Sequence, residues 1–348
     1  MLGALTRTRA VVNGATATRI RNLVGLVILA VILVVVAQKI AVRGLPFFIQ
    51  ILAFGVADGA IFALVALGYT MVYGIIELIN FAHGDVFTLG AFISLALMPA
   101  FGLAEGKSAG IAILLPMLGI GVITMLLCAG VNVTIERVAY RPLRNAPRLA
   151  ALITAIGMSS ILEGLMFMWR GPFFLHYPNL LPDARISLGG GVTIGVKDVV
   201  VIASALILMV ALTLFVNRSK LGKAMRATAQ DRDAAQLMGI DINLTIAATF
   251  FIGAVLAGAG GIIYGFYFNS VDAFLGFTAG LIAFTAAVLG GIGNIPGAAL
   301  GGLMIGVVRS FNDAYFASQW SEVYVFAILI AVLVFRPTGL LGMRVPEK

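Results

Sequence analysis

The sequence predicts an all-α, polytopic integral membrane protein with about eight membrane-spanning helices and a glycine-rich broken or re-entrant hairpin. Hydrophobic residues make up 61% of its 348 residues, and charged residues only 11%, whereas a soluble domain carries about 25% charged residues. The apolar residues also fall into long runs, and about 20 such residues are needed for a helix to cross a bilayer. A soluble enzyme, a disordered chain and a disulfide scaffold are therefore excluded.

Seven apolar runs are long enough to be spanning helices. In chain order they are Leu23–Val42, Phe47–Ile75, Val86–Ala104, Gly110–Val131, Leu149–Trp169, Val199–Phe215 and Thr245–Phe268. A glycine-rich run, Ala279–Val308, and a shorter run, Val323–Phe335, follow. We expect one membrane domain over residues 23–335, between a basic tail at 1–22 and a second tail at 336–348. The first run could instead be a cleaved secretory signal; its continuation to Val42 favours a retained helix.

The positive residues indicate how the chain is oriented, because cytoplasmic loops of membrane proteins are enriched in Lys and Arg. Sixteen of the 23 Lys and Arg residues flank the runs on one side, six lie on the other, and Arg309 is ambiguous. The larger set lies before the first run, after the fourth and the sixth, and at the chain end. Both termini are therefore expected in the cytoplasm, and the net charge of +8 is an orientation signal rather than a sign of nucleic-acid binding.

The expected side of the C-terminus constrains the glycine-rich run. After seven crossings the chain lies outside, so Ala279–Val308 must enter and return before Val323–Phe335 crosses inward. We expect a turn near Gly293–Gly297, which requires irregular backbone that is buried in protein or lines a cavity. Ten short crossings satisfy the same parity.

No motif for nucleotide binding or catalysis stands out in the sequence. The nearest match to a P-loop, Gly102–Ser108, is one residue short of the required spacing. Cys128 is the single cysteine, and the two histidines, His83 and His176, are far apart. We therefore expect no catalytic residues, no cofactor and no metal in this chain. Energy for uphill transport would come from an ion gradient or from a partner.

The loop at residues 218–243 is one candidate functional element. Residues Lys220 to Met238 are expected to form a helix that stops at Gly239. Ala234 and Ala235 would give a flat surface for another protein, with ion pairs at its rim. The residues proposed for this surface are Arg226, Asp231, Arg232, Asp233, Ala234, Ala235 and Gly239. The alternative is a solvated amphipathic linker between two spans.

A second set of residues is the candidate translocation path or gate. An ionisable group within a membrane span is a functional candidate by default, and glycines at four-residue spacing let helix backbones touch. The set is Asn80, His83, Gly84, Asp85, Asp58, Gly293, Asn294, Pro296 and Gly297. Asn80/Gly84 and Asn294/Gly297 are compared as corresponding bends of two half-repeats. Glu163 is a further acid within a span. Local hydrogen bonding and helix packing are the alternatives for all of them.

Several segments give the chain a family resemblance. They are Ala66–Gly74, Ile79–Gly84, Glu136–Leu143, Ala224–Ala227 with Asp231, Arg232, Gly239 and Ile240, Phe284–Gly297, and Phe335–Gly342. Through them the chain resembles the permease subunit of the branched-chain amino acid ABC importers, the hydrophobic amino acid uptake group. The resemblance covers most of the chain from about residue 50 onward, and it makes residues 23–335 a permease domain.

The resemblance implies a complex in a bacterial inner membrane. A second related permease, two cytoplasmic ATPase subunits, which bind ATP, and a periplasmic substrate-binding protein would be the partners. ABC permeases dock their ATPase through a loop of the form Glu-Ala-Ala-x3-Gly; here Asp233 replaces the Glu. The implied mechanism is alternating access driven by the ATPase, with the loop helix as a lever.

Few fixed charges along the chain favour a small, nearly neutral cargo. Branched-chain or other hydrophobic amino acids fit this description, and an ABC permease for urea or short amides is the alternative within the same class. A different class, an ion-coupled secondary carrier, would use Asp58, His83 and Asp85 as a proton path without an ATPase. A passive channel for a small solute is the third alternative.

Overall fold

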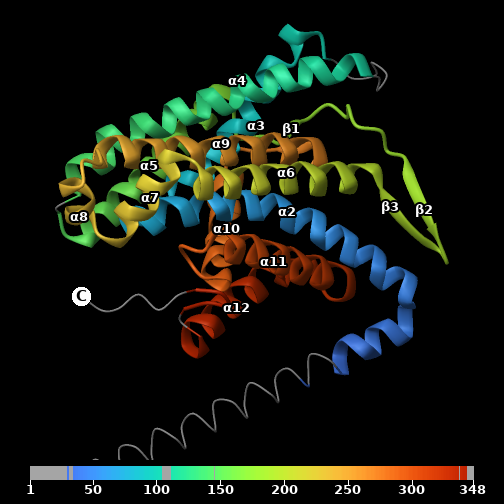
Figure 1. Ribbon diagram of the computed structural model, residues 1–348. Coiled ribbons are helices and arrows are strands. Elements are labelled where there is room, and N and C mark those ends of the chain that lie inside the picture. The colour runs from blue at the N-terminus through green and yellow to red at the C-terminus, as the bar shows by residue number, and fades with distance from the viewer. Residues whose placement is uncertain (1–29, 31–33, 104–110, 145, 337, 343–348) are drawn as a thin grey trace, which may run out of the picture.

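The computed structural model of the chain describes residues 30, 34–103, 111–144, 146–336 and 338–342 (Figure 1). The predicted tail at 1–22 and half of the first predicted span lie outside these residues. Residues 34–43 are helical and lead through Gly44, with φ 86°, into the first long helix.

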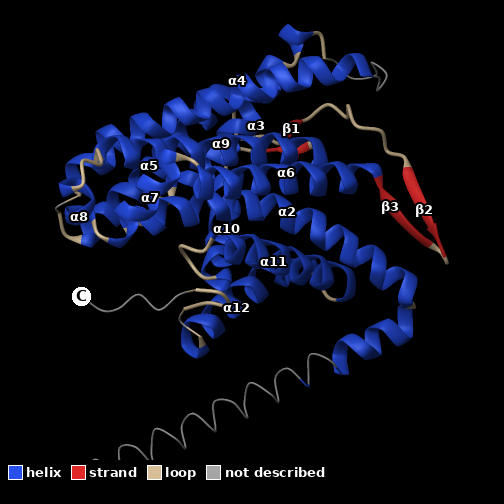
Figure 2. Cartoon of the chain, in the orientation of Figure 1, coloured by secondary structure: helices blue, strands red, loops and turns tan. Residues whose placement is uncertain are grey.

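The described residues are mainly helical (Figure 2), as the all-α prediction requires. The helices are α2 (Leu45–Ile76), α3 (Ala82–Leu97), α4 (Ile111–Ile135), α5 (Arg148–Arg170), α6 (Val196–Arg218), α7 (Lys220–Gln230), α8 (Arg232–Leu237), α9 (Ile242–Phe268), α10 (Leu275–Gly290), α11 (Ile295–Tyr315) and α12 (Ser321–Phe335). Short helical turns occur at Pro99–Phe101, Glu136–Tyr140, Arg141–Leu143 and Ser318–Trp320. Strands β1 (Leu175–His176) and β4 (Ser270–Val271) form one antiparallel pair, and β2 (Arg185–Gly189) and β3 (Val192–Gly195) form another.

Within the described residues, six helical segments are long and apolar enough to cross a membrane. The segments that contain α2 and α9 are 72% and 67% buried, whereas those that contain α4, α5, α6 and α12 are only 11–28% buried. Helices α2 and α9 therefore form the centre of a bundle whose outer helices present their apolar side chains to lipid. The polytopic α-helical fold class is confirmed, and the total number of crossings stays a prediction.

The chain folds into two halves of the same design that run in opposite directions. Helix α2 ends at Glu77 (φ 55°) and α9 at Asn269 (φ 53°), the two non-glycine residues with positive φ in the described chain. Each is followed by a short connection and a helix of 16 residues, α3 or α10. Helix α4 then packs against α9, and α11 against α2. The half-repeat correspondence therefore pairs the connection before α3 with that before α10; pairing Asn80/Gly84 with Asn294/Gly297 was wrong.

Helix α3 differs from the full-length span expected at Val86–Ala104. It starts earlier, at Ala82, and ends at Leu97, too short to cross a bilayer as a straight helix. Its first turn lies deep in the bundle, because His83 fits against Gly68 of α2 and Gly253 of α9. The expected span began only at Val86 because His83 and Asp85 are polar, but both side chains are buried in protein and α3 starts among them.

The predicted hairpin in Ala279–Val308 is present as two helices, α10 and α11. The chain reverses at 291–294, where Gly291 and Gly293 have φ of 107° and 89°, and the backbones of Gly290 and Gly297 touch. Helix α11 then returns along α2. A Cβ on Gly59 of α2 would lie 2.7 Å from the Leu303 Cα of α11, so the glycine permits close backbone contact.

The bundle has two ends, which we call the α8 end and the β end (Figure 1). The α8 end carries α7, α8 and the last described residues; the β end carries the β2–β3 hairpin, which extends beyond the helices. The two sets of Lys and Arg residues expected on opposite sides, as far as they are described, fall at these two ends. Arg309, the ambiguous one, lies within α11.

Candidate functional site

The short helices α3 and α10 cross at a contact made by three glycines. A Cβ on Gly84 would lie 2.8 Å from the Gly280 Cα, and one on Gly276 would lie 2.8 Å from the Asp85 Cα. No side chain fits between the two helices at this point. Both helices begin close to this crossing, so it is a junction of four chain segments at the interior of the bundle.

His83 lies next to the crossing and is fully buried. Its ring makes an edge contact with that of Tyr69, with 4.9 Å between centroids. Within the described part of the chain, neither ring nitrogen of His83 nor the Tyr69 hydroxyl has a well-placed hydrogen-bond partner. Buried polar groups are usually paired, so these two side chains stand out as functional candidates.

Asn80 precedes the crossing and belongs to a buried network. The Tyr140 hydroxyl donates to Asn80 Oδ1 at 2.9 Å, and Asn80 Nδ2 donates to Asn132 Oδ1 at 3.4 Å. Asn132 Nδ2 in turn donates to the Phe250 carbonyl of α9 at 2.8 Å. This network holds the connection between α2 and α3 against α4 and α9, and nothing in the sequence spacing indicated Asn132 or Tyr140.

The Asp85 side chain faces α5. The Ser159 hydroxyl donates to Asp85 Oδ2, and the other carboxylate oxygen has no partner among the described residues. Asp85 is fully buried, and Ser159 is the middle residue of α5. The acid predicted at this motif therefore sits at the mid-depth of the bundle.

Asp58 is not part of this cluster. Arg309 Nη1 of α11 donates to Asp58 Oδ2 at 3.2 Å, and the guanidinium lies over the Phe62 ring, 4.9 Å from its centroid. Arg309, which is 251 positions from Asp58 in the sequence, is therefore a partner of Asp58 that the sequence analysis did not identify. No hydrogen bond in the described part of the chain joins Asp58 to His83 or to Asp85.

The glycine-rich turn forms a third, separate group at the α8 end. Asn294 accepts from the Gly297 N–H at 3.2 Å and thereby caps α11, with Pro296 in its first turn. Its Nδ2 donates to the Leu341 carbonyl at 2.7 Å, and the Leu341 N–H pairs with the Gly290 carbonyl. A Cβ on Gly74, near the end of α2, would lie 3.3 Å from the Gly293 Cα. The turn therefore holds the chain segment at Leu341 through hydrogen bonds and is separate from the central crossing.

The expected single helix from Lys220 to Met238 is two helices. It breaks at Asp231, which has φ −156°, and the Asp231 carboxylate accepts from the N–H groups of Asp233 and Ala234 at 2.9 and 3.0 Å. An Asp that caps a new helix competes with continuation of the old one. Gly239, with φ 83°, follows the end of α8, as expected of a glycine stop.

Two arginines of the proposed surface, Arg226 and Arg232, donate to backbone carbonyls. Arg226 donates to the Val216 carbonyl and holds α7 against α6; Arg232 donates to the Ile75 carbonyl at the end of α2, at 3.0 Å. Ala235 is buried, whereas Leu237 and Met238 are 88% and 83% exposed. The apolar surface offered by α8 is thus formed by Leu237 and Met238.

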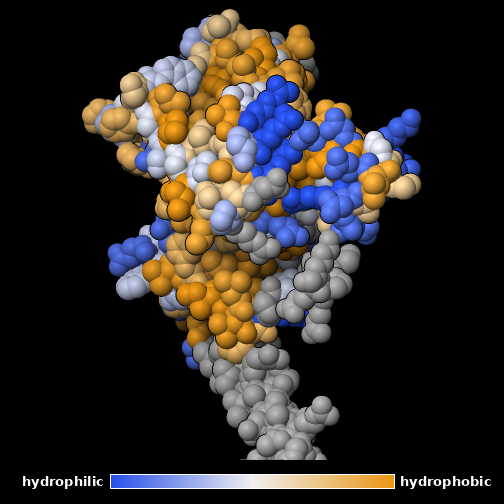
Figure 3. All heavy atoms as spheres, turned by 90° about the vertical axis from the view of Figure 1, so that its left-hand side faces the viewer, coloured by the Kyte–Doolittle hydropathy of each residue, from blue (hydrophilic) through white to orange (hydrophobic). Residues whose placement is uncertain are grey.

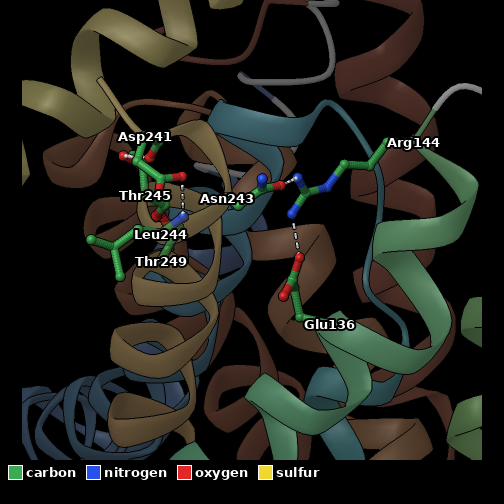
Figure 4. A network of polar contacts seen from close by, with 7 residues as sticks. All are labelled: Glu136, Arg144, Asp241, Asn243, Leu244, Thr245 and Thr249. Atoms are coloured by element: carbon green, nitrogen blue, oxygen red, sulfur yellow. Dashed lines mark hydrogen bonds and ion pairs between the residues drawn. The ribbon is translucent and has the colours of Figure 1, made fainter. Parts of the chain in front are cut away.

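A polar network joins this loop to the segment after α4 (Figure 4). Arg144 donates to the buried Glu136 carboxylate and, at 2.6 Å, to Asn243 Oδ1 in the first turn of α9. Asp241 caps the same helix end by accepting from the Leu244 N–H. The Glu136–Leu143 segment, noticed in the sequence only as a resemblance, therefore braces the end of the α7–α8 loop.

The α8 end carries both the exposed apolar side chains Leu237 and Met238 and the polar network around Arg144. Figure 3 shows hydrophilic side chains gathered at this end, with hydrophobic side chains on the flanks of the bundle. Among the described residues, no group of three His, Cys, Asp or Glu side chains could hold a metal ion. The arrangement suits contact with another protein at this end and passage of a solute through the bundle.

The chain is similar to known proteins over most of its length. The family model of the branched-chain amino acid transport system permease component matches residues 51–333. The chain is 43% identical over 307 residues to the high-affinity branched-chain amino acid transport system permease protein BraD of Pseudomonas aeruginosa, covering 86% of this chain and 98% of the relative. It is 39–40% identical over 305 residues to the LivH proteins of Salmonella typhimurium and Escherichia coli K12, covering 87% of this chain and 98% of each. No solved structure matches. The chain belongs to the family of permease components of branched-chain amino acid transport systems.

Proposed function

We propose that the chain is the membrane-spanning permease subunit of an ATP-driven importer for branched-chain or other hydrophobic amino acids. The observation that carries this proposal is the near-full-length similarity to BraD, which includes both half-repeats and the α7–α8 loop. The permease itself supplies the path, and partner subunits bind and hydrolyse ATP.

The α8 end faces the cytoplasm in this proposal. The described Lys and Arg residues that follow α4 and α6 lie at this end, and cytoplasmic ends are enriched in such residues. Two ATPase subunits, one on this chain and one on a second related permease, would contact α7 and α8. Leu237 and Met238 are the expected anchors, because exposed apolar side chains with a polar rim mark protein contacts. A periplasmic substrate-binding protein would meet the β end in the bacterial inner membrane.

The lever in this proposal is the α7–α8 pair rather than one rigid helix. Arg232 ties α8 to the end of α2, and Arg144 ties the start of α9 to the segment after α4. A push on α8 would therefore reach both central helices. The glycine contact at Gly84, Gly276 and Gly280 would let the two halves tilt against each other and open the path to either side.

The path residues are those near this contact: Asn80, His83, Gly84 and Asp85. The Asp58–Arg309 pair holds α2 to α11, and Gly293, Asn294, Pro296 and Gly297 form a hinge at the cytoplasmic end in this proposal. Urea or a short amide is the second candidate cargo, since its carriers would need the same scaffold. An ion-coupled carrier finds less support, because the relatives are permease components of transport systems and Asp58 is paired with Arg309.

Reconstitution tests the proposal. The chain would be placed in proteoliposomes with a second permease, both ATPases and the binding protein, and uptake of radiolabelled leucine and of urea would be measured. We expect leucine uptake that requires ATP and all subunits. Leucine uptake by this chain alone under a pH gradient, without ATP, would show an ion-coupled carrier instead.

A further inference from the structure

Helix α5 presents two sides of different chemistry. At about 100° per residue, Ile156, Ser160, Glu163 and Phe167 follow one stripe, and Met158, Ile161 and Leu165 follow another on the opposite side. Ile161 and Leu165 are 53% and 56% exposed, so their stripe suits lipid. The first stripe carries a hydroxyl and a carboxylate.

Glu163 is half-buried and lies well inside a helix that is apolar enough to span the membrane. A carboxylate at this depth almost always faces other protein or a water-filled cavity, because lipid solvates it poorly. No Lys or Arg in the described part of the chain forms an ion pair with Glu163 or with Asp85. The Ser160–Glu163 stripe is therefore unsuited to lipid, and it lacks a cation.

The same stripe adjoins the central crossing. Glu163 lies one helical turn beyond Ser159, whose hydroxyl donates to the Asp85 carboxylate, so Glu163 is on the same part of α5 as this contact. One Asp85 oxygen and the Tyr69 hydroxyl are buried without partners in the described chain. Tyr69 also borders a small cavity with Tyr73, Ile79 and Phe284. Neither Asp85 nor Glu163 therefore has a cationic partner within the described part of the chain.

An aromatic surface continues from α5 onto α10. The rings of Phe167 and Phe274 lie 6.2 Å apart, and Phe274 and Phe277 are each 50% exposed. Apolar rings beside a pair of carboxylates match both parts of a hydrophobic amino acid, its side chain and its ammonium group.

We propose that the Ser160–Glu163 side of α5, with the starts of α3 and α10, is one wall of the transport path, and that Glu163 receives the substrate's ammonium group, with the buried Asp85 behind it. The second permease supplies the opposite wall, so the site is complete only in the assembled transporter. This inference rests on the proposed function and sharpens it, because urea and neutral amides carry no ammonium group.

The first test measures leucine uptake by the complete transporter in proteoliposomes. Glu163→Gln should raise the leucine concentration for half-maximal uptake at least about tenfold, the loss expected of a charged hydrogen bond, and Glu163→Asp should recover part of it. Glu322→Gln, at the exposed start of α12, is the matched control and should behave as wild type. Co-purification of the subunits shows that each variant assembles.

The outcomes separate this inference from the function on which it rests. If the Glu163→Gln transporter takes up leucine with the same half-maximal leucine concentration as wild type, the ammonium site is overturned. The proposed function would still stand. A wild-type complex that takes up no leucine with ATP would overturn the proposed function, and this inference with it.

A second test reads water access and does not depend on substrate choice. Ser160→Cys should react with a membrane-impermeant methanethiosulfonate at least about tenfold faster than Leu165→Cys on the lipid side, and leucine-loaded binding protein should slow the reaction. The native Cys128 is fully buried and leaves a low background. Equal rates at the two positions would overturn the wall.

Discussion

Leu237 provides a quantitative test of the α8 docking surface. Its side chain is 88% exposed in the isolated permease, so truncation costs the fold almost nothing. If the ATPase covers it, Leu237→Ala removes about 2 kcal/mol of apolar burial, which weakens docking roughly 30-fold. Leu237→Asp should weaken it further, because a carboxylate would be buried without a partner.

The assay is binding of the purified ATPase to the permease in detergent or nanodiscs, measured as a dissociation constant. Leu188→Ala is the matched control, an exposed leucine on β2 at the opposite end of the molecule. Wild-type ATPase affinity in Leu237→Asp, with normal insertion, would refute α8 as the docking surface. Ala235 is a poorer probe, since it is buried and a larger side chain there would disturb α8 itself.

Three further predictions concern the interior contacts. Arg144→Ala leaves the buried Glu136 carboxylate unpaired and should destabilise the loop end by about 3 kcal/mol, which thermal unfolding and uncoupled ATP hydrolysis would reveal; an unchanged melting temperature would contradict it. Asp58→Arg should lower the yield of folded protein, and the swap Asp58→Arg with Arg309→Asp should restore part of it in size-exclusion profiles; no recovery would mean that the pair's orientation, not its charge, matters. Gly276→Ala should destabilise the crossing by about 1–3 kcal/mol, because the new methyl group meets the Asp85 backbone, whereas a fully stable variant would show that the crossing has room.

Hydropathy predicted the long helices α2, α4, α5, α6 and α9 because each apolar run is bounded by polar or charged residues. It predicted the break after α2 but misplaced α3, which starts at Ala82 instead of Val86 because His83 fits against Gly68, and which ends at Leu97. Such a fit depends on tertiary contact, which periodicity cannot encode. The turn before α11 was visible, since Gly291 and Gly293 need positive φ and Pro296 suits a first helical turn.

The candidate site was predictable as a list of residues but not as a geometry. Asn80, His83, Gly84 and Asp85 adjoin one another in sequence, so their common location followed directly. Their partners come from distant helices: Asn132, Tyr140 and Ser159 carry no local pattern that marks them. Arg309 could be found only as an ionisable group inside a span that requires a counter-charge.

The most direct test of the account is ATP hydrolysis by the assembled transporter with and without leucine-loaded binding protein, measured together with leucine uptake. The account predicts that the loaded protein stimulates hydrolysis, that uptake follows it, and that Leu237→Asp abolishes both. Accumulation of leucine by the purified chain alone under a pH gradient, independent of ATP and unaffected by Leu237→Asp, would contradict it.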